Sequence, residues 1–259
     1  MSGDWTQAWR PGQLVANRES GRGTRLLELE LRDELPFPFE PGHVVVLRHA
    51  GHRHPYTVSR ARPERRALDL LLRVIPGGRL TPALAAAAPG ALFEVSGLHH
   101  SPIQEGIADR AATVVGLATG SGLGPLWGFA EAALAGGWDR PIQLFAGFRE
   151  AADICLGPEL DALQARHPQF RWQPTLTRPE PGWQGLRGRL GESVPPLVRS
   201  PRSCHFHLVG NGAMLAEFMA ALEALGVPPE QVTSEVFFNF KAEPDPAAVQ
   251  TILAGLRKG

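Results

Sequence analysis

A run of small residues near the middle of the chain has the spacing needed to hold a phosphate group. Residues 113–115 are apolar and indicate a buried strand, and residues 126–135 indicate a helix. Between them lie residues that leave the backbone accessible or suit a helix start: Thr119, Gly120, Ser121, Gly122 and Pro125. A glycine turn between a strand and a helix presents backbone N–H groups, at the positive end of the helix dipole, to an anion. Alone it is weak evidence, because any α/β domain contains tight turns.

The glycine spacing excludes two common phosphate-binding motifs. In a Gly-x-Gly-x-x-Gly motif starting at Gly120 the third glycine would come later, whereas here it falls at Gly124 and Pro125 follows. A P-loop is excluded because no Gly-Lys-Ser/Thr sequence comes next.

A second turn of the same kind follows a predicted strand at 204–209. Its candidate binding residues are Gly210, Asn211, Gly212 and Met214. Two such turns in one parallel sheet can face the same crevice, although each is also explained as a tight turn. Met214 begins an apolar helix face that continues at Phe218 and Leu222, so the spacing itself predicts a core methionine.

The first hundred residues offer an aromatic platform and another helix start. Tyr56 is the only tyrosine, and it could stack on a planar heterocycle while the Thr57 hydroxyl forms a hydrogen bond. A tyrosine buried in the core is the alternative interpretation.

Further along, Gly77 and Gly78 precede a short helix whose N–H groups could bind a pyrophosphate, with Arg73 or Arg79 adding charge. Thr81, just before a proline, is predicted to be the N-cap of this helix. An ordinary capped helix is the alternative.

Composition limits the class of protein. Lys+Arg and Asp+Glu both number 26, so no basic field favours nucleic acid. Cys155 and Cys204 are the only cysteines, too few for an iron–sulfur cluster, and the scattered histidines do not suggest a metal site. Apolar runs are too short for a membrane span and the first residues do not resemble a signal peptide, so a cytoplasmic protein is expected.

The elements that would position these residues divide the chain into two domains and a tail. Short strands with Pro and Gly turns predict an antiparallel β-barrel over residues 1–106, with one helix at 80–88. From residue 107 to 240, strands alternate with helices, which predicts an α/β domain with a parallel sheet. Residues 241–259 form a tail with a short helix at 247–256.

Taken together and in order, these segments resemble the ferredoxin–NADP(H) reductase family, which includes flavodoxin reductases and reductase components of oxygenases. In that family an Arg-x-Tyr-Ser/Thr segment stacks the flavin, and His54, Pro55, Tyr56 and Thr57 match it with His54 replacing arginine. The Gly-Gly-x-x-Ser/Thr segment that holds FAD phosphates matches residues 77–81. The resemblance implies a FAD-binding barrel followed by a domain that binds a nicotinamide dinucleotide.

The second half continues the resemblance. Residues 120–125 match the nicotinamide-nucleotide loop, Arg149 matches a Gly-x-Arg segment, and Thr177-Arg178 stands for a Ser-Arg pair near the adenosine phosphate. Val209 replaces the cysteine of a Cys-Gly-x-x-x-Met segment, and Glu235 matches a late acidic residue.

The residue roles follow from this resemblance. The implied catalytic residues are Tyr56, Thr57 and Glu235. The implied cofactor-binding residues are His54, Pro55, Tyr56, Thr57, Arg73, Val74, Gly77, Gly78, Thr81, Thr119, Gly120, Ser121, Gly122, Pro125, Arg149, Thr177, Arg178, Gly210, Asn211, Gly212 and Met214.

The implied function is electron transfer from NADPH through FAD to ferredoxin or flavodoxin. Arg149 and Arg178 favour NADPH because they offer cations for its 2′-phosphate, whereas the segment at Trp183 resembles NADH-using reductases. An NADH-dependent component that reduces an oxygenase or another partner redox subunit is the first alternative. The second is a non-catalytic flavin- or nucleotide-binding subunit, suggested by the departures at His54 and Val209.

Overall fold

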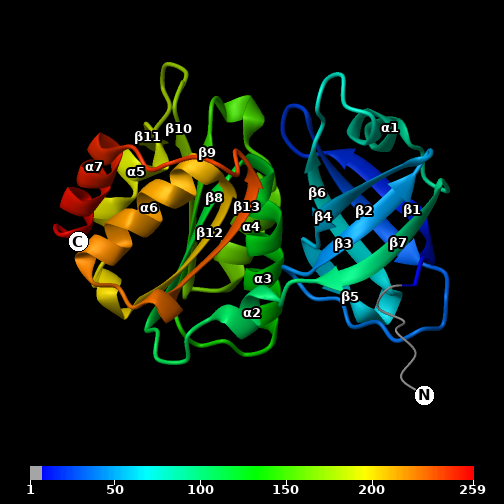
Figure 1. The fold of residues 1–259 in the computed structure, drawn as a ribbon, viewed down its shortest axis with the longest axis horizontal. Coiled ribbons are helices and arrows are strands. Elements are labelled where there is room, and N and C mark those ends of the chain that lie inside the picture. Colours follow the sequence, from blue (N-terminus) through cyan, green and yellow to red (C-terminus); the bar gives the residue numbers. More distant parts are fainter. Residues whose placement is uncertain (1–7) are drawn as a thin grey trace. The chain divides into compact units, whose positions relative to one another are not determined.

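The structure is a computed structural model that describes residues 8–259 (Figure 1). The chain forms two compact units, each with its own sheet. The barrel unit contains the chain up to residue 105 together with residues 124–132. The α/β unit contains residues 106–123 and 133–259.

The barrel unit is built on a seven-stranded antiparallel sheet in the order β4-β3-β7-β1-β2-β6-β5. Its elements are β1 (Arg10–Glu19), β2 (Thr24–Leu31), β3 (Val44–His49), β4 (His52–Thr57), β5 (Arg60–Arg62), β6 (Ala67–Arg73), α1 (Leu80–Ala86) and β7 (Leu92–His99). Among the described strands, β4 and β5 end the order without pairing to each other, so the predicted barrel is a half-barrel. Residues such as Leu27, Leu29 and Val45 fill its core.

The α/β unit is built on a six-stranded parallel sheet in the order β11-β10-β9-β8-β12-β13. Its strands are β8 (Thr113–Thr119), β9 (Ile142–Phe148), β10 (Phe170–Leu176), β11 (Leu186–Arg187), β12 (Cys204–Asn211) and β13 (Val232–Phe238). The helices that follow β7 are α2 (Ile103–Gly106), α3 (Leu123–Ala135), α4 (Gly157–Arg166), α5 (Leu190–Ser193), α6 (Gly212–Leu225) and α7 (Pro246–Leu256). Residues 103–105 of α2 and residues 124–132 of α3 are grouped with the barrel unit, and the other helices belong to the α/β unit.

Helices α5, α6 and α7 enclose one apolar core with the sheet (Figure 1). From the sheet, Phe206 and Leu208 of β12 are fully buried in this core, and Phe218 of α6 meets them. Ile252 and Leu256 of α7 are buried in the same core, so the last helix is an integral part of the α/β unit. Because alternate residues of a strand face opposite sides, His205, His207 and Val209 face away from this core.

The predicted fold class, an antiparallel β domain followed by a parallel α/β domain, is confirmed. One local prediction is wrong: Thr81 does not cap α1, which begins at Leu80 after Arg79. The Thr81 hydroxyl instead accepts a hydrogen bond from the Ile75 N–H at 2.9 Å, so it closes the preceding turn. Within the described residues, no helix combines the length and the apolar character needed to cross a membrane.

Candidate functional site

The two glycine turns lie at the point where the parallel sheet reverses its winding order. From β8 the chain passes through α3 to β9 on one side, whereas from β12 it passes through α6 to β13 on the other. Since β8 and β12 are neighbours, the turns after their carboxyl ends lie side by side (Figure 1). Open α/β sheets bind ligands in the crevice that forms at such a switch point.

The two turns contact each other directly. The Asn211 N–H donates to the Thr119 hydroxyl at 2.8 Å. A Cβ added to Gly210 would lie 2.2 Å from the same hydroxyl oxygen, and one added to Gly122 would lie 2.9 Å from the Val209 carbonyl oxygen. Gly122 and Gly210 are therefore required by close packing, whatever binds nearby.

Gly120 has a different environment. Its φ is +54°, and a Cβ there would meet no atom within 4 Å, so its outer face is open. Its carbonyl accepts a 3.6 Å hydrogen bond from the thiol of Cys155, which sequence reasoning had not connected with this turn. Burial raises the pKa of Cys155 to about 12, so the thiol stays protonated and supports the turn. An added Cβ would therefore meet no clash at Gly120, and the backbone of this turn is open on that side.

The residues of the second turn are engaged mainly in contacts within the protein. The Asn211 side-chain oxygen accepts the Ala213 N–H at 3.1 Å and caps α6. A Cβ on Gly212 would meet the Asn239 carbonyl oxygen at 2.1 Å, and Met214 is 8% exposed within the core. This turn therefore forms the capped start of α6 beside the crevice, and the Asn211 and Met214 side chains contact the protein itself.

Three other predicted residues lie on the elements around the switch point. Ser121 lies in the short 3-10 helix Gly120–Gly122, and Pro125 lies in the first turn of α3. Glu235 is half-buried on β13, opposite the fully buried Val209 of β12. The structure therefore brings Glu235 to the carboxyl half of the strand next to the second turn.

The predicted adenosine-phosphate residues follow two adjacent strands. Arg149 comes directly after β9, and Thr177 and Arg178 come directly after β10. The Arg178 N–H donates to the Arg149 carbonyl oxygen at 2.7 Å, which holds the two segments together. Both arginine side chains are exposed. They form an accessible pair of cations at the carboxyl edge of the sheet.

In the barrel unit, Tyr56 lies on the end strand β4. Its ring is half-buried against the barrel core, and burial raises its pKa to about 12. The rings of Tyr56 and His54 have centroids 5.5 Å apart, and His54 and Pro55 are exposed. Thr57, the last residue of β4, is half-buried. The phenol therefore keeps an accessible part, which a stacking platform needs.

The other barrel residues surround the turn between β6 and α1. Arg73 is exposed at the end of β6, and the Val74 N–H donates to the Gly23 carbonyl oxygen at 2.8 Å. Gly77 has a φ of +74° with open space where a Cβ would lie, whereas a Cβ on Gly78 would meet the Ile75 carbonyl oxygen at 2.9 Å. Since β4 contacts both β6 and α1, the predicted flavin residues gather in one region of this unit.

A histidine pair was missed at the sequence level. His205 and His207 of β12 are both buried, and both contact the Thr233 hydroxyl of β13 at 2.8 Å. The signal was present, because two histidines two positions apart in a strand face the same side.

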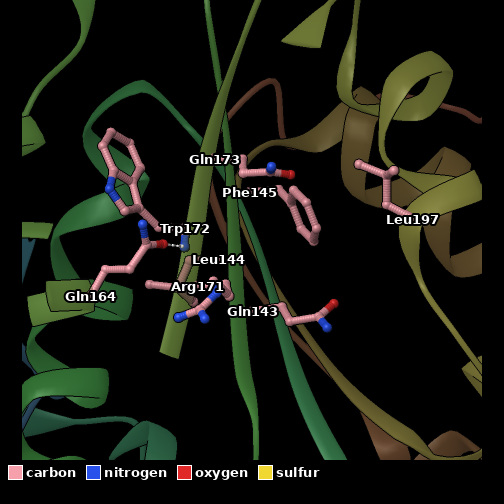
Figure 2. Close-up of a pocket in the computed structure, with 8 residues that line it drawn as sticks. All are labelled: Gln143, Leu144, Phe145, Gln164, Arg171, Trp172, Gln173 and Leu197. Atoms are coloured by element: carbon pink, nitrogen blue, oxygen red, sulfur yellow. Dashed lines mark hydrogen bonds between the residues drawn. The ribbon is translucent and has the colours of Figure 1, made fainter. Parts of the chain in front are cut away.

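A separate cavity of about 240 Å³ lies along β9 and β10 (Figure 2). Its lining residues are Gln143, Leu144, Phe145, Gln164, Arg171, Trp172, Gln173 and Leu197. Figure 2 shows the Gln164 side chain turned to β10, where its oxygen accepts the Trp172 N–H at 2.9 Å. Six of the lining residues lie on these two strands, Gln164 lies in α4 and Leu197 lies in the 3-10 helix Pro195–Leu197. None of them is a predicted site residue.

Comparison with known proteins gives concordant matches. The family described as Oxidoreductase NAD-binding domain matches residues 117–219. The reductase subunit of an aromatic O-demethylase from Amycolatopsis sp. is 31% identical over 225 residues, 83% of this chain. Ferredoxin–NADP reductase B of Sorangium cellulosum is 30% identical over 191 residues, 72% of this chain and 78% of that protein.

A solved structure supports the fold. A ferredoxin NADP+ reductase from Neisseria gonorrhoeae, determined with bound FAD and NADP, matches with a TM-score of 0.76 at 19% identity. The match covers 89% of this chain and 99% of that chain. The chain spans 65% of the length of the O-demethylase reductase subunit, less than two thirds.

Proposed function

The chain belongs to the ferredoxin–NADP reductase family, and on that basis we propose that it is a FAD-dependent oxidoreductase moving electrons between NADPH and a one-electron protein carrier, ferredoxin or flavodoxin. The observation that carries the proposal is the pair of contacting glycine turns at the switch point of the parallel sheet. We also propose that residues 1–106 bind the flavin, that residues 107–240 bind the nucleotide and that the protein acts in the cytoplasm.

The barrel residues fit a flavin. Tyr56 is a half-buried aromatic residue on β4, and Arg73 and the open backbone at Gly77 offer a cation and free space for phosphate oxygens. His54, Pro55, Thr57, Val74, Gly78 and Thr81 complete the proposed contact set. Bound FAD would supply the step from two-electron to one-electron chemistry.

The nucleotide residues fit a dinucleotide across the carboxyl edge of the α/β unit. The N–H groups around Gly120 and the start of α3 would hold the pyrophosphate. Arg149, Thr177 and Arg178 would hold the adenosine end, and the turn at residues 210–212 would line the crevice. In the barrel unit, Thr57 is the proposed hydrogen-bonding group beside the flavin. In the α/β unit, Glu235 is the proposed group that would orient the nicotinamide or hold a proton.

The preference for NADPH rests on exposed cations. Neither Arg149 nor Arg178 has an ion-pair partner among residues 8–259, so each is available to a 2′-phosphate. Replacing Arg178 by Gln should lower kcat/KM for NADPH about three- to tenfold, because an exposed charge-assisted contact is lost, and should change NADH little. Steady-state rates with both nucleotides measure this, and an equal loss with both would contradict it.

A second candidate is an NADH-dependent reductase component of an oxygenase or another multisubunit redox enzyme. The similarity to the reductase subunit of an aromatic O-demethylase favours a role as one subunit of a larger redox enzyme. The same comparison of NADPH with NADH separates the two candidates, together with copurification of the electron-accepting partner.

The central test uses the purified full chain. We expect a yellow protein with a flavin spectrum that bleaches when NADPH or NADH is added without oxygen. A colourless protein, or a yellow one that neither nucleotide bleaches, would favour a non-catalytic flavin- or nucleotide-binding subunit instead.

A further inference from the structure

One hydroxyl in the α/β unit bridges two buried histidines. The Thr233 Oγ1 of β13 lies 2.8 Å from Nε2 of His205 and 2.8 Å from Nδ1 of His207, both on β12. His205 is completely buried and His207 is 6% exposed. The Thr233 methyl faces Gly106, where an added Cβ would lie 3.3 Å away. The three side chains are therefore packed as well as hydrogen-bonded.

The backbone sets the tautomer of the first histidine in this cluster. The Ala108 N–H donates to Nδ1 of His205 at 3.2 Å, so a neutral His205 carries its proton on Nε2 and donates it to Thr233. The Thr233 hydroxyl can accept that bond and donate its own proton to Nδ1 of His207, and in this arrangement the proton of His207 lies on Nε2. That nitrogen is buried and has no hydrogen-bond partner among the described residues.

Strand β13 depends on this cluster more than an inner strand would. It is an end strand of the sheet, so its register is set by β12 alone. The pairing is regular from Phe206 to Gly210 and becomes irregular at Asn211. A slip of one residue would turn every side chain of β13 to the opposite face.

We propose that His205, Thr233 and His207 form a register clamp, in which Thr233 is a positioning residue that places Glu235 at the nucleotide-binding edge. Glu235 lies two residues after Thr233 on the same face of β13, opposite Val209. The irregular pairing begins at Asn211, four residues after His207 of the clamp. The role of Glu235 rests on the proposed function, whereas the clamp itself does not.

The test compares Thr233→Val, which keeps the shape and removes the hydroxyl, with Thr233→Ser, which keeps the hydroxyl. In the full chain, Thr233→Val should speed hydrogen exchange of the β13 amides at least about tenfold relative to Thr233→Ser, with little change in β8 and β9. Nitrogen NMR should show the Nε2–H form of both histidines in the wild type and in Thr233→Ser, and an altered form in Thr233→Val. Thr251→Val, on the exposed side of α7, is the matched control. Equal exchange and equal histidine signals in both Thr233 variants would overturn the clamp.

A double-mutant comparison tests the link to Glu235. Thr233→Val should slow flavin reduction by the nucleotide about tenfold in the wild type and less than about twofold in a Glu235→Gln background. An equal loss in both backgrounds would overturn action through Glu235. If Glu235→Gln alone leaves the rate unchanged, the proposed role of Glu235 is wrong and the positioning claim fails, while faster β13 exchange would still support the clamp.

Discussion

At the scale of single residues, the glycines of the first turn have separable roles. Gly122 is confined by the Val209 carbonyl at 2.9 Å from an added Cβ, whereas Gly120 faces open space with a φ of +54°. Close packing therefore requires glycine at 122, whereas the left-handed backbone favours glycine at 120.

This difference predicts opposite outcomes for two alanine variants. Gly122→Ala should lower the free energy of unfolding by about 1–3 kcal/mol, because the new methyl meets backbone. Gly120→Ala should cost only about 1 kcal/mol for the left-handed conformation but should weaken NADP+ binding. Urea unfolding and NADP+ titration measure both quantities. Unchanged NADP+ affinity in Gly120→Ala would show that this turn does not contact the nucleotide.

Tyr56 carries the corresponding prediction for the flavin. Tyr56→Ala should weaken FAD binding at least about tenfold, because the phenol ring on β4 is lost. Tyr56→Phe is the control and should retain the flavin, since the ring is kept and the phenol stays neutral with its pKa raised to about 12. Flavin content after gel filtration measures both. Full flavin content in Tyr56→Ala would exclude the stacking role.

At the scale of elements, β12 makes the stability of the α/β unit sensitive to acid. Burial lowers the pKa of His205 to about 4, with a smaller effect from Arg140 in the same direction. Burial also lowers the pKa of His207 to about 3, with a smaller effect from His205. Both imidazoles are therefore neutral in the folded protein near neutral pH.

The sign of the pH dependence follows from these directions. In the unfolded chain a histidine takes up a proton near pH 6.5. The contribution of each buried neutral imidazole to the free energy of unfolding is therefore complete above that pH, and it is lost as the pH falls towards 4 for His205 and 3 for His207. Each imidazole adds a slope of up to about 1.4 kcal/mol per pH unit in that window. His207→Gln should flatten the curve of unfolding free energy against pH, measured by urea unfolding between about pH 7.5 and 4.5. Parallel curves for the two proteins would contradict this origin.

At the scale of the whole molecule, the barrel unit is assembled from two segments of chain. Residues 124–132 join the first segment, and a Cβ on Gly128 would lie 1.5 Å from the Ser59 carbonyl oxygen. Arg60 pairs with Glu131 at 3.1 Å and lies over the Trp127 ring at 4.6 Å. The unit is thus completed by residues beyond its continuous strands.

Gly128→Ala tests this assembly. It should destabilise the protein by at least about 3 kcal/mol, because backbone rather than a flexible side chain would have to move. Gly157→Ala in α4 is the control, since its nearest contact would be an ordinary 3.6 Å, and it should be close to neutral. Thermal unfolding of both variants measures the difference. Similar melting temperatures would show that residues 124–132 contribute little to the barrel unit.

Much of the architecture was predictable because its signals are local. Apolar alternation, apolar runs and glycine or proline turns predicted most strands of both sheets, although the short strands β5 and β11 were missed. The ordered motifs identified the family that the relatives confirm. The assignment of Thr81 as a cap failed because its hydroxyl had a competing partner, the Ile75 N–H. The roles of the individual site residues stay predictions until the variants are measured.

The sequence by itself determined the two kinds of sheet and the glycine turns, since periodicity and backbone freedom are properties of neighbouring residues. Only the tertiary structure decided that β8 and β12 are adjacent, that Asn211 meets Thr119 and that Thr233 joins His205 to His207. Those pairings link residues far apart in the chain, and their cause is the order in which strands pack, which no local pattern encodes.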